Sequence, residues 1–391
     1  MKPETIAILP PLVPAEGRPF GIYVHVPFCA TRCGYCDFNT YTADELGDGT
    51  SPGGWLEALR AELELAAQAL DRAPSVETVF VGGGTPSMLG GSGLTEVLDA
   101  IRAHFTLAPG AEVTTEANPE STSPAFFEAI RAAGYTRVSL GMQSAAPHVL
   151  ATLDRVHAPG RAVAAAQEAR AAGLGHVNLD LIYGTPGETD DDLRRSIDAV
   201  LDAGVDHVSA YALVVEEGTA LARRVRRGEL PSPDEDALAD RYQLLDTALS
   251  QAGLGWYEVS NWARPGGHCR HNMGYWAGGD WWGAGPGAHG HVSGVRWWNV
   301  KHPNTYAKHL GEGRLPVGGH EILSPAERHT EEVLLAVRLN TGIALADLTV
   351  DERSRVPAVV AGGLGQVLGD RLVLTDRGRL LADGVVRTIL D

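Results

Sequence analysis

Strand patterns rich in apolar and β-branched residues alternate with amphipathic helix patterns over the first half of the chain. The strand patterns cover residues 22–26, 78–81, 112–116, 136–141, 177–182 and 207–213, and the helix patterns between them cover 55–70, 93–105, 124–133, 161–172 and 190–203. Strands that are joined by such helices pair in parallel, which predicts an α/β fold. Six strands in this order favour a partial (β/α)6 barrel with its ligands at the carboxyl ends of the strands, although the alternation alone equally allows an open doubly wound sheet.

Three cysteines directly follow the first predicted strand. Cys29, Cys33 and Cys36 have the spacing CxxxCxxC within GIYVHVPFCATRCGYCDF, residues 21–38. Three closely spaced thiolates can hold three irons of a cubane iron–sulfur cluster and leave the fourth iron open. A zinc site normally has four ligands, and strand alternation directs the nearby His25 away from the cysteine loop. A disulfide framework is disfavoured because the chain has only four cysteines and nothing marks it for secretion.

This cysteine stretch resembles the radical S-adenosylmethionine (SAM) superfamily, in which an aromatic residue, here Tyr35, precedes the third cysteine. The resemblance implies a 4Fe–4S cluster whose open iron is chelated by the amino and carboxylate groups of SAM. It also implies that one electron from the reduced cluster cleaves SAM to methionine and a 5'-deoxyadenosyl radical. An electron donor for the cluster is therefore an expected partner.

The charge of the chain restricts its other partners. There are 32 Lys and Arg residues against 49 Asp and Glu residues, which gives a net charge of -17. A field of that sign repels nucleic acid and anionic membranes. The segment 1–19 is interrupted by prolines, unlike a signal peptide, and no run approaches the roughly 18 apolar residues of a membrane helix. We therefore expect a cytoplasmic protein with reduced thiols, no nucleic-acid partner and no stable membrane insertion.

The composition changes near residue 255. Between there and residue 309 lie six of the 14 histidines and seven of the eight tryptophans. From about residue 321, helix patterns at 325–338 and 352–366, a strand at 371–374 and a helix from 376 onward predict a small winged-helix-like unit, whose acidity argues against DNA binding. The predicted domains are an N-terminal arm at 1–20, the barrel at 21–254, an aromatic- and His-rich extension at 255–320 and a C-terminal winged-helix-like domain at 321–391.

Glycine-rich or polar motifs lie at the ends of four of the predicted strands. The sequence GGGTPS begins at Gly82, Glu116 lies in TTEANPES, Gln143 in SLGMQS and Asp180 in NLDLIYGTPGET. A polar residue within an apolar strand costs free energy unless a partner satisfies it. One such residue alone is more often part of a core hydrogen bond than a ligand, but several at the same end of a sheet favour a shared polar ligand.

The motifs YVHVPFCxxxCxYC, GGGTPS, EANPES, GMQS followed by an arginine, DLIYGTPGET and SAYAL together resemble the oxygen-independent coproporphyrinogen III oxidase family. The resemblance covers most of the chain, and the order and spacing of the motifs are specific to this family. Matched position by position, it implies ten SAM-binding residues: Tyr23, Tyr35, Gly83, Gly84, Thr85, Glu116, Gln143, Arg155, Asp180 and Ala212. No catalytic side chain is predicted beyond these.

Two features differ from the oxidase itself. Phe38 stands where the oxidase has a further cysteine, and about 20 residues precede the cluster strand where the oxidase has a longer extension. Residues 271–276 read HNMGYW and match the HNxxYW motif of the HemW branch, whose members are regarded as heme chaperones. This match implies four heme-binding residues: His271, Asn272, Tyr275 and Trp276.

The heme motif has a physical rationale and several alternatives. An imidazole can ligate heme iron, and aromatic rings give the macrocycle an apolar face. A single histidine in a tryptophan-rich segment is more often structural, however, and the other candidate iron ligands are His268, Cys269, His289 and His291. Heme propionates are candidates for pairing with Arg264, Arg270, Arg296 or Lys301, which are otherwise solvated surface charges.

The leading hypothesis is a heme chaperone that keeps a SAM-coordinated 4Fe–4S cluster and hands heme to an acceptor protein. One alternative is a radical SAM oxidase that removes two propionate carboxyls from coproporphyrinogen III. Another is a radical SAM enzyme for an unrelated substrate. Whether the protein is an enzyme therefore stays open at this point.

Overall fold

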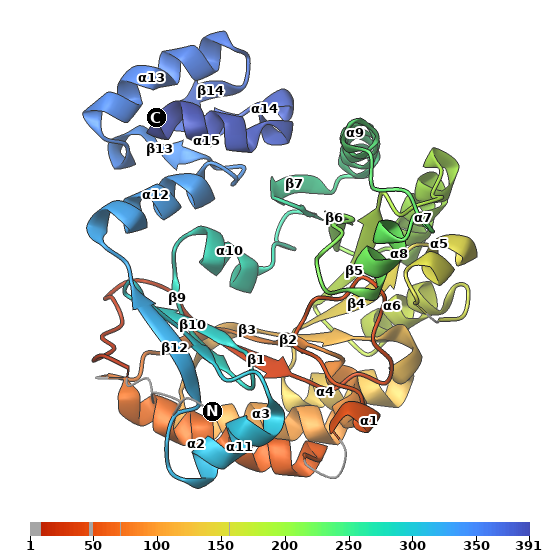
Figure 1. Ribbon diagram of the computed structural model, residues 1–391, viewed down its shortest axis with the longest axis vertical. Helices are drawn as coiled ribbons and strands as arrows, with labels where there is room; N and C mark the ends of the chain where they lie inside the picture. The colour runs from red at the N-terminus through yellow and green to blue at the C-terminus, as the bar shows by residue number, and fades with distance from the viewer. Residues whose placement is uncertain (1–8, 47–49, 71, 156) are drawn as a thin grey trace.

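A single large sheet forms the centre of the molecule (Figure 1). The computed structural model describes residues 9–46, 50–70, 72–155 and 157–391, so part of the predicted N-terminal arm lies outside the described residues. The sheet has 12 strands in the order β12-β11-β10-β9-β1-β2-β3-β4-β5-β6-β8-β7. Six consecutive members are the strands that the sequence predicts for the barrel: β1 (Phe20–Val26), β2 (Val76–Gly83), β3 (Leu107–Ala117), β4 (Arg137–Gln143), β5 (His176–Tyr183) and β6 (His207–Ala212).

The strand order decides between the two predicted α/β architectures. Strands β1 to β6 are parallel neighbours in the order of the sequence. Every crossover therefore runs in the same direction and places its helix on the same face. A doubly wound sheet would reverse direction partway, so the structure confirms the partial (β/α)6 barrel.

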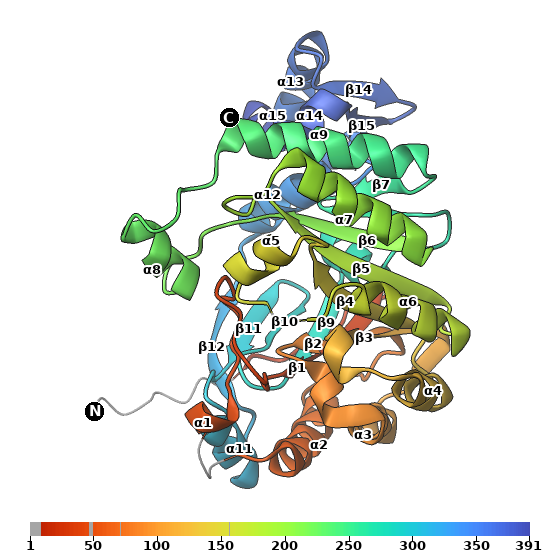
Figure 2. The ribbon, with the colours of Figure 1, turned by 90° about the vertical axis from the view of Figure 1, so that its right-hand side faces the viewer.

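Helices cover the outer face of these parallel strands (Figures 1 and 2). They are α2 (Pro52–Ala69), α3 (Gly90–His104), α4 (Pro124–Ala133), α6 (Arg161–Ala171) and α7 (Asp190–Ala203), with the short α1 (Ala43–Leu46), α5 (Pro147–Thr152) and α8 (Ala220–Arg226) and the longer α9 (Glu235–Gln251) nearby. Side chains of Ser51, Ser123 and Thr189 accept backbone N–H groups at the starts of α2, α4 and α7. Within the described ranges, no helix combines the length and the apolar character required to cross a bilayer.

The tryptophan-rich segment extends the sheet at both edges. On one side β8 (Asn261–Ala263) pairs with β6, and β7 (Gly255–Glu258) pairs with β8. On the other side β9 (Asp280–Ala284) pairs with β1, followed by β10 (His289–Val292), β11 (Val295–Asn299) and β12 (Val317–Ile322). Helix α10 (Arg270–Trp276) connects the two edges and packs on β1 and β2, while α11 (Pro303–Gly311) packs on α2. The predicted heme motif is therefore carried by α10.

The C-terminal residues form a second sheet with its own hydrophobic core. Its elements are α12 (Pro325–Ala336), β13 (Ile343–Ala344), α13 (Val350–Ala361), β14 (Gly365–Leu368), β15 (Arg371–Leu374), α14 (Asp376–Leu380) and α15 (Ala382–Leu390). The predicted helix over 352–366 was wrong at its end, because the left-handed Gly363 (φ +69°) turns the chain into β14. Arg379 donates to both carboxylate oxygens of Asp246 on α9, at 2.9 and 2.7 Å, where α9 runs beside this unit (Figure 2). The domain boundaries themselves stay a prediction.

Candidate functional site

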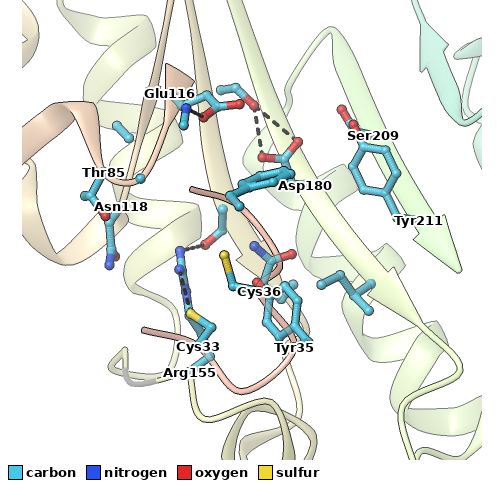
Figure 3. Close-up of a pocket in the computed structure, with 18 of the residues that line it drawn as sticks. Cys33, Tyr35, Cys36, Thr85, Glu116, Asn118, Arg155, Asp180, Ser209 and Tyr211 are labelled. Carbon is cyan, nitrogen blue, oxygen red and sulfur yellow. Dashed lines mark hydrogen bonds between the residues drawn. The ribbon is translucent and has the colours of Figure 1, made fainter. Parts of the chain in front are cut away.

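A cavity of about 420 Å³ lies where the parallel strands end (Figure 3). All three predicted cluster cysteines line it, together with nine of the ten residues matched to SAM binding, which are Tyr35, Gly83, Gly84, Thr85, Glu116, Gln143, Arg155, Asp180 and Ala212. The tenth, Tyr23, does not line the cavity, and its hydroxyl lies 3.0 Å from Nδ1 of His25. Residues from five different strand ends and from the cysteine loop thus meet at one place, as parallel strands in a barrel predict.

The cysteine loop is held by backbone hydrogen bonds to elements far along the chain. Gly34 donates to the carbonyl of Leu153 at 3.1 Å and accepts from the N–H of Leu221 at 2.8 Å. All four cysteines of the chain are free, which argues against the disulfide alternative. In the described parts of the chain no three His, Cys, Asp or Glu residues lie close enough to hold a single metal ion. Thiols spread around one side of a cavity suit separate irons of a cubane better than one zinc ion.

His25 does not add a fourth ligand to the cysteine loop. Its Nδ1 faces the hydroxyl of Tyr23 at 3.0 Å, and its Nε2 lies 2.9 Å from the carbonyl oxygen of Asn39. Both ring nitrogens therefore have partners away from the cysteine sulfurs. The zinc alternative loses its nearest candidate ligand, as the strand alternation predicts.

Two polar side chains contact the cysteine sulfurs. Nη1 of Arg155 lies 3.6 Å from the sulfur of Cys33, and the hydroxyl of Thr85 lies 3.8 Å from the sulfur of Cys29. Burial raises the pKa of the Cys29 and Cys36 thiols, so these two thiols are protonated at neutral pH until a metal displaces the proton.

Two partly buried carboxyl groups lie on the cavity wall opposite the cysteine loop. Glu116 accepts the N–H of Gly83 at 3.0 Å, and Asp180 accepts the hydroxyl of Ser139 at 3.2 and 3.0 Å (Figure 3). Burial, and then the charge of Asp180, raises the pKa of Glu116 to about 8. Burial also raises the pKa of Asp180 against the opposing hydrogen bonds. A cationic ligand in the cavity would lower both pKa values, so the site suits a molecule with ammonium or sulfonium charge.

Two residues at the cavity have an unusual backbone conformation, and two glycines there lie close to neighbouring atoms. Gln143 and Asp154 have positive φ angles of 66° and 52°, which are uncommon for residues other than glycine. A register shift in the β4 and β5 pairing lies between Gly141 and Gln143. A Cβ on Gly141 would come within 2.6 Å of Nη2 of Arg155, and a Cβ on Gly84 within 2.5 Å of the carbonyl oxygen of Phe28. Glycine is therefore required at position 84, where the backbone of the cysteine loop approaches, whereas a side chain at position 141 would displace the guanidinium of Arg155.

Three exposed apolar side chains surround the mouth of the cavity. They are Phe38, Tyr211 and Val214, with exposed fractions of 60%, 45% and 61%. From the sequence, Phe38 was identified only as a replacement for a cysteine, and Tyr211 and Val214 were not predicted to be part of the site. The sequence signal that could have indicated Tyr211 and Val214 is the apolar run that continues past β6 into the following loop.

The predicted heme ligand His271 is a buried, doubly hydrogen-bonded residue. Its Nδ1 lies 2.8 Å from the hydroxyl of Thr78, and its Nε2 lies 2.8 Å from the hydroxyl of Tyr275. The ring stacks on Phe80 with centroids 5.3 Å apart. Burial lowers the pKa of His271 to about 3, so the imidazole is neutral. Of the four residues matched to heme binding, Asn272 lines the cavity, whereas His271, Tyr275 and Trp276 do not.

A buried ion pair holds the segment that leads into α10. Nε of Arg137 lies 3.1 Å from Glu112, and its Nη2 donates to the carbonyl oxygens of Gly267 and His268 at 2.8 and 2.9 Å. The other oxygen of Glu112 accepts the backbone N–H of His271 at 3.1 Å. Neither charged residue was predicted as part of the site, because a strand sequence carries no signal for a partner some 130 residues away.

The other candidate iron ligands already have contacts in the fold. The thiol of Cys269 donates to Glu112 at 3.5 Å, and His268 stacks on Tyr257 with centroids 4.3 Å apart. His291 contacts the carbonyl of Gly279 through Nδ1 and the N–H of Gly294 through Nε2, and His289 lies against Trp298. Of the candidate propionate partners, Arg270 forms an ion pair with Glu77, and Arg296 with Glu321 and Glu331.

A partial barrel with three cysteines at the carboxyl ends of its strands defines the chain as a radical SAM protein. The family model of the radical SAM superfamily matches residues 23–200. A Mycobacterium tuberculosis protein named heme chaperone HemW is 71% identical over 382 residues, which cover 98% of this chain and 97% of that protein. A Lactococcus lactis protein of the same name is 30% identical, with 93% of each chain covered. The chain belongs to the HemW family.

The solved structure of coproporphyrinogen III oxidase from Escherichia coli has the same fold. It matches with a TM-score of 0.81 and 23% identity, covering 95% of this chain and 90% of the oxidase. The comparisons confirm the family resemblance and the fold that the sequence motifs predict. Membership of the radical SAM superfamily implies a 4Fe–4S cluster and SAM, and the three cysteines and the polar cavity fit both groups.

Proposed function

We propose that this protein is a heme chaperone, which binds heme, keeps a SAM-coordinated 4Fe–4S cluster and passes the heme to an acceptor protein. The observation that carries this proposal is the 71% identity, over 98% of the chain, with a relative named heme chaperone HemW. The absence of the oxidase cysteine at Phe38 agrees with a carrier rather than a decarboxylase.

The cluster and SAM occupy the cavity in this proposal. Cys29, Cys33 and Cys36 are the cluster ligands, and the matched cavity residues bind SAM, with Glu116 beside the glycine motif available to an ammonium group. SAM on a reduced cluster supplies a carbon radical in this superfamily. The chain's own contribution is to hold the thiolates and to surround the cationic ligand with hydrogen-bond acceptors.

Heme binds at the HNxxYW segment in this proposal, with His271 as the iron ligand and Asn272, Tyr275 and Trp276 around the macrocycle. The neutral imidazole has a lone pair for iron, but one ring nitrogen must first leave Thr78 or Tyr275. Helix α10 has only seven residues and lies between Gly266 and Gly278, both at positive φ. We therefore propose that α10 moves as a unit when heme binds.

Partners and location complete the proposal. Heme transfer requires an acceptor protein, and reduction of the cluster requires an electron donor. We place the protein in the cytoplasm, where reducing conditions keep the three cluster thiols available for iron. The domains proposed are the barrel at 21–254, the extension at 255–320 that carries the heme motif, and the C-terminal unit at 321–391, with the N-terminal arm before them.

An anaerobic titration tests the function directly. Cluster-reconstituted protein is titrated with heme, while a parallel sample receives coproporphyrinogen III, SAM and a reductant. We expect stoichiometric heme binding, transfer of the heme to apomyoglobin as a probe acceptor, and no decarboxylated porphyrin in the second sample. Formation of the divinyl porphyrinogen would overturn the carrier function, and so would the absence of heme binding.

A further inference from the structure

A series of buried hydrogen bonds connects the predicted SAM site to the predicted heme segment. The amide Nδ2 of Asn178 donates to Asp180 Oδ1 at 2.6 Å, and Asn178 Oδ1 lies 2.7 Å from Nδ1 of His207. Nε2 of His207 lies 2.7 Å from the hydroxyl of Tyr257. That hydroxyl accepts the backbone N–H of Cys269 at 3.2 Å. We call these five residues the relay.

The donor and the acceptor of each hydrogen bond in the relay can be assigned, beginning at Asp180. Asn178 Nδ2 faces the carboxylate of Asp180, so Oδ1 is the atom that faces His207, and an amide oxygen only accepts. Nδ1 of His207 is therefore the donor. Burial lowers the pKa of His207 well below its ordinary value, so the ring is neutral and Nε2 accepts the proton of the Tyr257 hydroxyl. All donors then point toward Asp180, an arrangement in which successive hydrogen bonds strengthen one another.

The relay has little exposure to solvent, although Asp180, Asn178, His207 and Cys269 all line the cavity. Asn178, His207, Tyr257 and Cys269 are 3%, 2%, 0% and 3% exposed. Within the described residues, the ring nitrogens of His207 and the hydroxyl of Tyr257 have no other hydrogen-bond partner. A ring nitrogen of His207 or the hydroxyl of Tyr257 that loses its partner in the relay is left as a costly unpaired polar group unless the neighbouring relay residue moves with it.

The relay ends at the residue that precedes α10, the helix with the predicted heme motif. Cys269 is the N-cap of α10, and His271 lies two residues further on. Movement of α10 separates Nδ1 of His271 from Thr78 on β2, whereas Tyr275 lies on α10 itself and moves together with His271. The proposed function therefore requires a second position of α10, and the hydrogen bond from the backbone of Cys269 to Tyr257 stabilises the position seen in this structure.

We propose that His207 and Tyr257 are positioning residues, which couple the occupancy of Asp180 by SAM to the placement of His271 for heme. The inference rests on the proposed function, because it needs both ligands. A ligand hydroxyl that donates to Asp180 competes with Asn178 for the carboxylate. The amide of Asn178 then turns toward its other two acceptors, the hydroxyls of Ser139 and Ser209 at 2.7 and 3.0 Å, and His207 and Tyr257 follow this shift. In this proposal the SAM site and the heme site both shift the equilibrium between two positions of α10. Such coupling is reciprocal, so SAM changes the heme affinity by the same factor as heme changes the SAM affinity.

The test is a pair of titrations on the full-length, cluster-reconstituted protein. Heme affinity is measured with and without saturating SAM, and SAM affinity with and without heme. The first ratio is that of the heme affinities with and without SAM, and the second is that of the SAM affinities with and without heme. For the unmodified protein we expect the two ratios to be equal and to differ from one by a factor of about five or more. In Tyr257→Phe, which keeps the ring and removes the hydroxyl, we expect both ratios to fall to within about twofold of one.

A matched variant controls for the loss of a buried hydroxyl. Tyr135→Phe removes a hydroxyl that is equally buried and donates to the carbonyl of Leu94 at 2.8 Å, outside the relay. This variant should keep the ratios of the unmodified protein. If Tyr257 only stabilised the fold, Tyr257→Phe would weaken heme binding by the same factor with and without SAM. The ratio of the two heme affinities would then equal that of the unmodified protein.

Each outcome decides one question. If heme binds but SAM leaves its affinity unchanged, or if Tyr257→Phe keeps the full ratio, the coupling is overturned and the heme chaperone proposal stands. If the unmodified protein binds no heme, the proposed function itself fails. Should Tyr257→Phe fail to fold by circular dichroism, His207→Gln is subjected to the same ratio test, with the Soret band as an independent reading of the iron ligand.

Discussion

The guanidinium of Arg155 lies against the sulfur of Cys33, with 3.6 Å between Nη1 and Sγ. Its position is fixed by a second hydrogen bond, from Nη2 to the carbonyl oxygen of Gly141 at 3.0 Å. Reduction of an iron–sulfur cluster adds a negative charge, which a nearby fixed positive charge stabilises. In the proposed site, Arg155 is therefore placed to raise the reduction potential of the cluster.

Replacing Arg155 with glutamine should lower the midpoint potential of the cluster. A unit charge several ångströms away, at the effective dielectric constant of a protein, corresponds to a shift on the order of 100 mV. An anaerobic redox titration followed by electron paramagnetic resonance measures the potential. Arg102→Gln on the outer helix α3 removes the same charge at a distance and should leave the potential unchanged. Equal potentials for Arg155→Gln and the unmodified protein would exclude this role.

Serine replacements of the cluster cysteines should abolish cluster assembly. Each of Cys29, Cys33 and Cys36 holds one iron in our assignment, and a serine hydroxyl is a poor substitute for a thiolate. The measurement is visible absorbance after reconstitution, with iron and labile sulfide analysis. Cys269→Ser is the control, because that thiol is buried beside Glu112 and should not be needed. Retention of a cubane in all three cluster variants would refute the ligand assignment.

The sequence predicted those features of the site that depend on local patterns. The CxxxCxxC spacing and the strand after which it lies are contiguous, and the carboxyl ends of parallel strands converge in any barrel. For this reason Glu116, Gln143 and Asp180 could be expected in one cavity before their contacts were known. Tyr23 belongs to the same motif but does not line the cavity, because its position on β1 turns it toward His25.

Features that depend on distant partners could not be predicted in the same way. The sequence places the tryptophan-rich segment in an extension, but nothing local indicates that β8 pairs with β6 while β9 pairs with β1. Likewise, the spacing of HNMGYW cannot reveal that His271 is bonded to Thr78 on β2. Strand register and side-chain pairing over such separations are set by the packing of the whole sheet.

SAM binding should strengthen as the pH rises toward 8. Burial and the neighbouring Asp180 raise the pKa of Glu116 to about 8, so the carboxyl is protonated at lower pH and becomes an acceptor for an ammonium group only as the proton leaves. One linked proton gives at most a tenfold gain in affinity per pH unit below that pKa, and a plateau above it. Equilibrium dialysis of SAM between pH 6.5 and 9 measures the slope.

Glu116→Gln separates this effect from other titrations in the cavity. The amide keeps the shape and an acceptor oxygen for the N–H of Gly83 but has no proton to release. We expect weaker SAM binding with a flatter dependence on pH. If the variant and the unmodified protein show the same slope, the titrating group is not Glu116.

Heme binding should respond in opposite directions to two changes around one imidazole. His271→Ala removes the proposed iron ligand and should weaken heme binding while the cluster absorbance stays. Tyr275→Phe keeps an aromatic ring beside heme but removes the hydroxyl that now occupies Nε2 of His271. Iron binding at Nε2 requires this hydrogen bond to break, and its net worth is about 1 kcal/mol, so with Nε2 as the ligand atom the deletion should tighten heme binding roughly fivefold.

Thr78→Val makes the corresponding change at the other ring nitrogen, because the Thr78 hydroxyl lies 2.8 Å from Nδ1. The variant that tightens heme binding identifies the nitrogen that is freed for iron, and the remaining hydroxyl then orients the ring. Optical heme titrations of the three variants, compared with the unmodified protein, measure the affinities. If His271→Ala binds heme as tightly as the unmodified protein, and neither hydroxyl deletion has an effect, then the iron ligand is not His271, and α10 has no need to move.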